Sequence, residues 1–249
     1  AYLDVSDAPY CDGSATRIAQ AITGRISKEL ALTASAGVSY NKFLAKMASE
    51  VNKPDGLFVI APGAGADFVA TLPIGKFFGI GPATAKKLKA AGIHDGADLR
   101  GLGREQLRGL LGKAGDYYFK VARGVDDRPV VAHRIRKSLG SETTFADNIT
   151  DLPRALRELR VLSDKVAAML ERARLVPRTI TLKVKYADFR QVTRAASVAA
   201  TPMSAREILR VVEQLLARTE TGHRPVRLLG ITTSNFLSAE EREQLALFD

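Results

Sequence analysis

The chain has 249 residues, 46% of them hydrophobic, which is enough for one large domain or for two to three small ones and excludes a disordered chain. Cys11 is the only cysteine, so no intrachain disulfide can form and a cytoplasmic protein is expected. The three histidines are far apart, which disfavours a zinc site, and no membrane-spanning run or signal-peptide pattern is present. The formal net charge of +10 favours a polyanionic partner such as nucleic acid, although a merely soluble basic protein would carry the same charge.

The first region, residues 1–66, alternates strand-like and helix-like stretches. A turn at Pro54-Asp55-Gly56 precedes its last strand, and the glycine-rich residues 62–65 end it. The predicted strands are 1–5, 32–38 and 57–60, and the predicted helices are 14–30 and 41–51.

Short helices separated by glycines form the second region, residues 67–127, with no strand signal between them. A basic connector, nearly without regular structure, follows at 125–137 and contains two arginines and a lysine near its end. The predicted helices are 82–91, 96–101, 104–111 and 116–123.

The strongest local signal for DNA binding is Gly79-Ile80-Gly81-Pro82-Ala83-Thr84-Ala85-Lys86-Lys87-Leu88, which is typical of a helix-hairpin-helix. Two glycines permit a tight turn, and Pro82 suits the first position of the next helix. Backbone N–H groups at that helix start can hold a DNA phosphate without reading sequence. An ordinary helical turn with a solvated basic face is the alternative. The predicted DNA contacts are Gly79, Ile80, Gly81, Ala83, Thr84 and Lys86.

The third region, residues 139–238, reads strand-helix-strand-strand-helix-strand, a split βαβ arrangement with helices on one sheet face and the other face open. Thr179 to Tyr186 alternates cleanly and puts Thr181 and Lys183 on the predicted open face, which suits a nucleic-acid groove. The fold class is therefore α+β with several domains. The predicted strands are 139–145, 179–186, 190–199 and 226–236, and the helices are 152–175 and one opened by the capping box Ser204-Ala205-Arg206-Glu207. The apolar face of the first helix is Leu152, Leu156, Leu159, Leu162, Val166, Met169 and Leu170.

Four segments of the first region resemble the palm of the Y-family of lesion-bypass DNA polymerases, and within it the bacterial DNA polymerase IV group. They are Ala1-Tyr2-Leu3-Asp4-Val5-Ser6, Ser35-Ala36-Gly37-Val38-Ser39, Asn41-Lys42-Phe43-Leu44-Ala45-Lys46 and Asn52-Lys53-Pro54-Asp55-Gly56. The resemblance spans essentially the whole chain in family order. It implies the C-terminal part of a palm at 1–66, a helical thumb at 67–127, a basic linker at 128–138, a little finger domain at 139–238 and a clamp-binding tail at 239–249.

The resemblance also implies a reaction. In the family, a primer 3′-hydroxyl attacks the α-phosphate of a deoxynucleoside triphosphate, and two Mg²⁺ ions held by three carboxylates activate it. An Asp-Glu pair directly precedes the Ala-Tyr-Leu-Asp run in the family, and another Asp lies far upstream. The expectation is thus a C-terminal portion of an error-prone polymerase, with its metal ligands before Ala1 and no activity of its own. Asp4, Asp7 and Asp12 are not expected to replace those ligands, because Asp4 falls beyond the metal cluster and the others belong to the following turn.

The resemblance also implies residues that bind the incoming nucleotide and the DNA backbone. Lys53 matches the lysine that reaches the triphosphate of the incoming nucleotide, although a plain surface lysine before a turn is the alternative; Lys42 and Lys46 are weaker candidates. Positions that touch the DNA backbone in relatives are matched by Arg136, Lys137, Ser138, Arg190 and Thr193, which are expected to share a face with Thr181 and Lys183.

The end of the chain, Gln244-Leu245-Ala246-Leu247-Phe248, resembles the peptide that bacterial replicative enzymes insert into the sliding clamp. Leu245, Leu247 and Phe248 would fill an apolar groove while Gln244 fixes the register. A terminal segment folded back on its own domain is the alternative. A monomer is expected, with primer-template DNA, deoxynucleoside triphosphates and the clamp as partners.

Two other functions fit parts of the sequence. A non-catalytic adaptor that joins duplex DNA to the clamp satisfies the DNA-binding and tail signals. A repair nuclease or ligase fragment would share the helix-hairpin-helix, but it leaves residues 52–56 and the third region unexplained.

Overall fold

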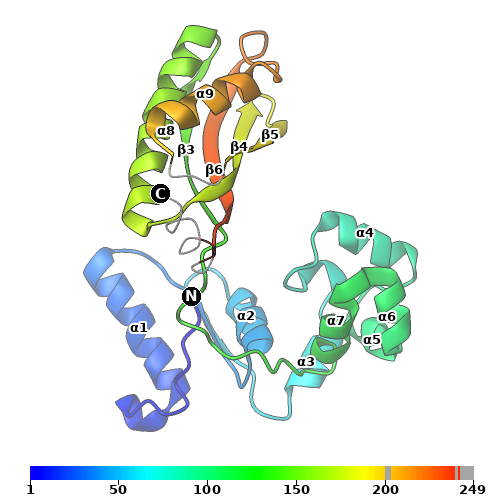
Figure 1. The fold of residues 1–249 in the computed structure, drawn as a ribbon. Helices are drawn as coiled ribbons and strands as arrows, with labels where there is room; N and C mark the ends of the chain where they lie inside the picture. Colours follow the sequence, from blue (N-terminus) through cyan, green and yellow to red (C-terminus); the bar gives the residue numbers. More distant parts are fainter. Residues whose placement is uncertain (200–202, 239–240, 242–249) are drawn as a thin grey trace. The chain divides into compact units, whose positions relative to one another are not determined.

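A computed structural model describes residues 1–199, 203–238 and 241 (Figure 1). The chain divides into two compact units, Ala1–Ala132 and His133–Asp249. Each unit has its own hydrophobic core, so each is described by itself. Among the described residues, no helix is both long enough and apolar enough to cross a bilayer.

The first half of unit 1 contains two short parallel strands and two helices. Strand β1 pairs with β2 from Ala36↔Leu57 to Val38↔Val59. The prediction of a strand at residues 1–5 was wrong: these residues belong to neither sheet, and a strand needs a partner for its backbone groups. The elements are the 3₁₀ helix η1 (Tyr10–Gly13), α1 (Ala15–Leu30), β1 (Ala36–Val38), α2 (Lys42–Val51) and β2 (Leu57–Val59).

The second half of unit 1 is helical, as the glycine-separated patterns predict. Helix α3 was not predicted, because the glycines of residues 62–65 read as an end to regular structure. Gly65 instead opens α3, where an added Cβ would lie 2.1 Å from the Tyr40 hydroxyl, so only glycine allows this close approach. The elements are α3 (Gly65–Ala70), η2 (Ile74–Lys76), α4 (Pro82–Ala90), α5 (Gly96–Gly101), α6 (Arg104–Leu111), η3 (Gly112–Ala114) and α7 (Gly115–Val121).

One hydrophobic core connects both halves of unit 1. Phe43 and Leu44 of α2 are buried in the same cluster as Phe77, Leu88 and Leu99 of the helical half. Asn41 caps α2 by accepting a hydrogen bond from the Leu44 amide at 2.9 Å, which fixes the start of this helix. The core therefore crosses residue 66, and the division of this unit into palm and thumb stays a prediction.

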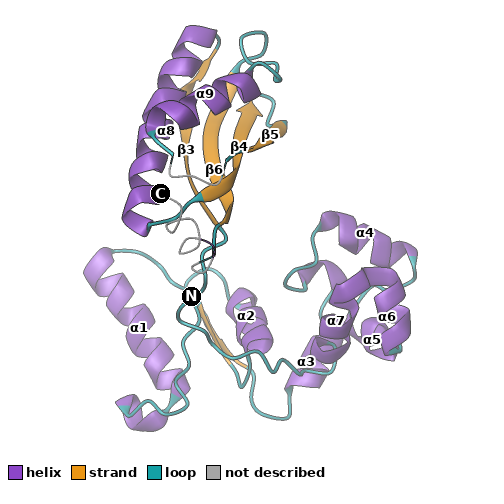
Figure 2. Cartoon of the chain, viewed as in Figure 1, coloured by secondary structure: helices purple, strands orange, loops and turns teal. Residues whose placement is uncertain are grey.

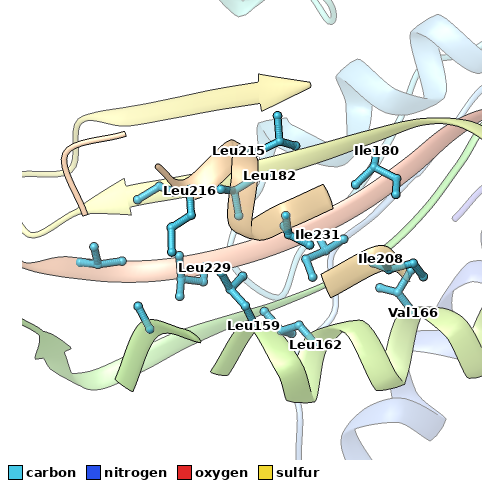
Figure 3. Packing of buried hydrophobic residues seen from close by; sticks show 14 of the residues in the cluster. Leu159, Leu162, Val166, Ile180, Leu182, Ile208, Leu215, Leu216, Leu229 and Ile231 are labelled. Carbon is cyan, nitrogen blue, oxygen red and sulfur yellow. The ribbon is translucent and has the colours of Figure 1, made fainter. Parts of the chain in front are cut away.

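Unit 2 has the predicted βαββαβ order, with all four strands antiparallel to their neighbours in the order β3-β6-β4-β5. Helix α8 packs on β3 and β6, and α9 packs on β4 and β5, so both helices cover one face of the sheet (Figure 2). Figure 3 shows the core between these layers, where Leu159, Leu162 and Val166 of α8 point toward the sheet. The elements are β3 (Ser138–Ile149), α8 (Leu152–Ala173), β4 (Pro177–Tyr186), β5 (Gln191–Ser197), α9 (Ala205–Leu216) and β6 (Val226–Phe236).

Two details of unit 2 differ from the sequence prediction. Leu152 does not belong to the buried face of α8; it is 44% exposed, because it is the first residue of the helix and lies beyond the core. Arg190 was predicted to begin a strand but lies in the turn before β5, which starts at Gln191. The capping box at Ser204 and Glu207 is present as predicted.

Candidate nucleic-acid interface

The helix-hairpin-helix loop lies between η2 and α4 of unit 1 and depends on Gly79. Its φ of +90° is unfavourable for residues with a side chain, and an added Cβ would lie 2.8 Å from the Tyr118 hydroxyl. That hydroxyl donates to the Phe78 carbonyl at 3.4 Å and so helps to hold the loop. Gly81 has an ordinary φ of −79° and serves as the N-cap before Pro82. Only the first of the two glycines therefore needs its conformational freedom here.

Four backbone amides of this loop lack an acceptor. The N–H groups of Gly79, Gly81, Ala83 and Thr84 make no hydrogen bond with any described residue. The helix start adds a partial positive charge, so these amides form a site for an anion such as a phosphate. Ile80 differs from its neighbours: its N–H donates to the Phe77 carbonyl at 3.0 Å and its side chain is buried. Ile80 thus supports the loop from inside and has no free donor for DNA.

The two lysines after the loop are not equivalent. Lys86 is exposed and has no hydrogen-bond or ion-pair partner among the described residues. Lys87 donates to the Leu110 carbonyl near the end of α6, which fixes its ammonium to the protein. Of the two, Lys86 has the ammonium that is free to pair with a phosphate.

The sheet face opposite the helices of unit 2 collects four of the predicted DNA contacts. Thr193 pairs with Lys183 across β5 and β4, and Thr181 lies two residues along β4 on the same face. Ser138 lies on this face as well, because it pairs with Ser234 of β6, which pairs with Thr179 of β4. The face is polar and carries small side chains, so a nucleic-acid backbone can approach it closely.

Lys183 is partly neutralised on this face. Its ammonium lies 2.6 Å from a Glu142 carboxylate oxygen, and Gly230 of the intervening strand β6 leaves the space across which they meet. An added Cβ at Gly230 would lie 2.9 Å from the Glu142 Cβ, so the crossing needs glycine. Glu142 could not be predicted from the sequence, because its position near Lys183 depends on non-local strand pairing.

Arg190 belongs to a network of ion pairs at the end of the sheet. Its guanidinium lies 3.3 Å from a Glu220 oxygen, and Arg224 pairs with both Glu220 and Asp188. The hydrogen bond from Arg224 holds the pKa of Glu220 below its usual range, although burial opposes this. Arg190 is therefore engaged within the protein, unlike the other predicted contacts of this unit except Lys183.

Arg136 and Lys137 are exposed and make no hydrogen bond or ion pair with any described residue. They directly precede β3, whose first residue, Ser138, lies on the open face. These two cations are therefore available for phosphates, and their contact with DNA stays a prediction.

The first residues of the connector make side-chain contacts that the sequence did not predict. The Asp126 carboxylate accepts a hydrogen bond from the Phe43 amide at 3.0 Å and pairs with Arg128 at 2.6 Å. Arg128 also lies over the Tyr117 ring, with its central carbon 4.4 Å from the ring centroid. The prediction that residues 125–137 have almost no regular structure is confirmed, because no helix or strand occurs there. The side-chain contacts of Asp126 and Arg128 were not predicted, because no sequence periodicity signals them.

Lys53 follows the end of α2 and shares a carboxylate with Lys46. The two ammonium groups lie 2.7 and 2.6 Å from Glu50, and hydrogen bonds from Lys46 and Lys53 keep the pKa of Glu50 below its usual range. Both lysines line a cavity of about 500 Å³ between α1, β1 and α2, which has an otherwise largely apolar wall. Lys42 instead donates to the Pro129 carbonyl at 3.1 Å.

The carboxylates near the start of the chain do not fit a two-magnesium site. Asp4 accepts hydrogen bonds from the Ser6 amide and hydroxyl, and Asp12 pairs with Arg17. No group of three His, Cys, Asp or Glu side chains suited to a metal occurs in the described part of the chain. The predicted clamp-binding residues Gln244, Leu245, Leu247 and Phe248 lie outside the described residues.

Comparison with known proteins gives a consistent result along the chain. The impB/mucB/samB family matches residues 1–50, the helix-hairpin-helix motif of the same family matches 62–93, and the family's C-terminal domain matches 136–247. A DNA polymerase IV of Alkalilimnicola ehrlichii is 51% identical over the whole chain, which covers 70% of that protein. A DNA polymerase IV of Clostridium perfringens is 45% identical over 99% of the chain and 69% of that protein.

Solved structures agree with the sequence matches. A chimera of the Y-family DNA polymerases Dbh and Dpo4 is similar with a TM-score of 0.74 and 28% identity, over 94% of this chain and 68% of the other. An insertion ternary complex of Dbh DNA polymerase is similar with a TM-score of 0.55 and 26% identity, over the same shares.

Proposed function

Because the chain belongs to the impB/mucB/samB family of Y-family DNA polymerases, we propose that it serves template-directed DNA synthesis of the translesion, error-prone type. The reaction is nucleotidyl transfer from deoxynucleoside triphosphates to a primer. The role of the residues described above is to hold the primer-template DNA. The observation that carries the DNA-binding part of this proposal is the set of four amides before and at the start of α4 that have no acceptor among the described residues.

Two surfaces hold the DNA backbone in this proposal. The amides of Gly79, Gly81, Ala83 and Thr84 bind one phosphate, with Lys86 beside them, and read no base. In unit 2, a strip made by Arg136, Lys137, Ser138, Thr181, Lys183 and Thr193 follows further phosphates; Arg190 contributes only if it leaves Glu220. Binding by such groups is independent of sequence and weakens with added salt, because counterions are released.

Lys53 binds the triphosphate of the incoming nucleotide in this proposal. Its ammonium, now paired with Glu50, exchanges that single carboxylate for a group with several negative oxygens. Lys46 stays on Glu50 and prevents that carboxylate from being left alone. A long flexible stem and a compact charge suit this role. The family implies Mg²⁺ as the cofactor, which would supply charge stabilisation when bound, but the described carboxylates do not hold it.

The test is a pair of measurements on the 249-residue chain. We expect it to bind primer-template DNA of unrelated sequences with similar affinity and with a steep loss between 50 and 200 mM salt, as roughly 10³-fold losses accompany several phosphate contacts. Binding that is absent, or that does not change with salt, would overturn the proposal. A control with a neutral oligonucleotide analogue should bind far more weakly.

A second candidate is a non-catalytic module that binds duplex DNA and the sliding clamp, and it is favoured by the pairing of Asp4 and Asp12 with other groups. Primer extension with Mg²⁺ separates the two for this chain. Templated incorporation by the 249 residues would exclude the adaptor, and DNA binding without any incorporation would favour it. The protein is proposed to be a cytoplasmic monomer whose tail reaches the clamp; replacing Leu247 and Phe248 by Ala should then abolish clamp binding and spare DNA binding.

A further inference from the structure

The turn between β4 and β5 holds an aromatic side chain outward. Phe189 is 62% exposed and has a φ of +67°, a conformation that is rare for a bulky residue. Its amide donates to the Tyr186 carbonyl at 3.0 Å, so the turn is closed and not loose. A bulky residue held at a positive φ in a closed turn is uncommon, so the backbone conformation is the feature that sets Phe189 apart.

Both neighbours of Phe189 are fixed to the rest of unit 2. Asp188 pairs with Arg224 and also accepts a hydrogen bond from the Arg190 amide at 3.1 Å. Arg190 pairs with Glu220 at 3.3 Å. The residues on either side therefore point back to the α9–β6 connection, and the ring between them is left on the outside.

Two cations lie against the ring. The Lys185 ammonium is 4.9 Å from the ring centroid, and the Arg227 guanidinium carbon is 5.0 Å from it. Neither cation has an ion-pair partner among the described residues, in contrast to Lys183 with its Glu142. Lys185 lies opposite Gln191 and Leu228 in the strand pairing, which puts it at the end of the open face that carries Lys183 and Thr193.

We propose that Phe189, with Lys185 and Arg227, is a binding point for an unpaired nucleotide, in which the ring stacks on the base and the two cations hold its flanking phosphates. This inference rests on the proposed function, because it extends the DNA strip of the open face beyond the duplex. The chemistry matches a nucleotide part by part: a flat apolar base and, next to it, a diester anion. Bases within a duplex are already stacked, so the ring selects single-stranded DNA such as a template overhang.

The experiment compares two DNA probes with the full 249-residue chain and two substitutions. One probe is a duplex with a single-stranded 5′ template overhang containing 2-aminopurine, and the other is the blunt duplex. Phe189→Gly removes the ring and relieves the turn, since glycine adopts a positive φ freely. Phe189→Tyr keeps a ring. Ala31→Gly is the matched control, because Ala31 also has a positive φ, of 52°, but lies at the end of α1.

We expect Phe189→Gly to weaken binding of the overhang by roughly 5- to 100-fold, the range of one base–aromatic stack, and to abolish 2-aminopurine quenching. Blunt-duplex affinity should be unchanged, and the melting temperature should stay equal or rise. Phe189→Tyr and Ala31→Gly should bind both probes as the parent chain does. Equal overhang affinity in Phe189→Gly, or an equal loss on both probes, would overturn the inference. If the parent chain binds neither probe, the proposed function itself fails.

Discussion

In the proposed function, the helix-hairpin-helix loop of unit 1 and the open sheet face of unit 2 bind DNA by different means. In the loop, the donors are backbone amides fixed by the turn at Gly79 and the start of α4. On the sheet, they are side chains, and one of them, Lys183, is already paired with Glu142. The loop therefore depends on backbone shape, and the sheet depends on charge. Substitutions should therefore affect the loop through geometry and the sheet through electrostatics.

The largest effect is expected for Gly79→Ala. The positive φ costs about 1–2 kcal/mol for a residue with Cβ, and the contact 2.8 Å from the Tyr118 hydroxyl adds a similar strain. Unfolding by urea should show the loss of stability, and DNA affinity should fall about tenfold or more as the amides move, since 1.4 kcal/mol is a factor of ten.

Gly92→Ala is the matched control for this prediction. Gly92 has a comparable φ of +80°, but an added Cβ there would meet nothing within 4 Å. The variant should lose the smaller amount of stability that φ alone costs and should bind DNA normally. If Gly79→Ala loses no more DNA affinity than Gly92→Ala, the loop does not bind through its backbone shape.

The next largest effect is expected for the loss of a buried carboxylate in unit 1, compared with the loss of an exposed carboxylate in unit 2. The Asp126 side chain is 1% exposed, whereas Glu220 in unit 2 is 46% exposed. Asp126→Ala leaves the buried Phe43 amide without its acceptor, which should cost about 1–3 kcal/mol in urea unfolding. Glu220→Ala should cost less than about 1 kcal/mol, as exposed pairs do. Equal losses of unfolding free energy in the two variants would mean that Asp126 does not fix the start of the connector.

The same carboxylate predicts a dependence on pH. Burial raises the pKa of Asp126, but the hydrogen bond from Arg128 and the amides outweigh it and hold the pKa below its usual range. The folded state therefore binds this proton less readily than the unfolded chain does. The stabilisation is complete above the unfolded pKa of about 4 and is lost as the pH falls through the folded value. Asp126→Asn should flatten the acid limb of the stability curve, measured by thermal unfolding from pH 7 downward.

The helices and strands whose bounds depend on a local sequence pattern were predicted best. The helices at 96–101 and 104–111 and the strand at 226–236 have the predicted bounds, because periodicity and flanking glycines decide them locally. The strand at residues 1–5 failed because a strand also needs a neighbour that no local pattern reveals. The sequence predicted that Gly79 permits a tight turn, and its positive φ confirms this. The hydrogen bond from the Ile80 amide to the Phe77 carbonyl could not be predicted, because it depends on how the turn folds.

The site in unit 2 was predicted only in part. Strand alternation was enough to put Thr181 and Lys183 on one face, and it was borne out. The partner of Lys183 could not be found, because Glu142 lies 41 residues away and meets it across β6. Phe189 was missed for the same reason: its two cations come from different strands, and its exposure comes from a backbone angle.

Arg136 and Lys137 test the electrostatic half of the comparison. Replacing both by Ala should reduce the slope of log affinity against log salt by about 2 and weaken binding several-fold at 100 mM salt, with no change in melting temperature. Lys28→Ala, an exposed lysine near the end of α1, is the control and should leave the slope unchanged. An unchanged slope in the double variant would remove these two cations from the interface.

The smallest expected effect has the opposite sign. Glu142→Gln removes the negative charge that lies 2.6 Å from the Lys183 ammonium, so the lysine is released toward phosphates and an acidic group leaves the DNA-facing surface. DNA affinity should rise about two- to fivefold, which is the size of an exposed ion pair, and the salt dependence should steepen by up to one unit. Glu158→Gln on α8, which covers the other sheet face, is the matched control and should change affinity much less. Affinity that falls in Glu142→Gln would mean that the pair positions Lys183 for DNA and does not compete with it, and the charge-based account of the sheet face would then be wrong.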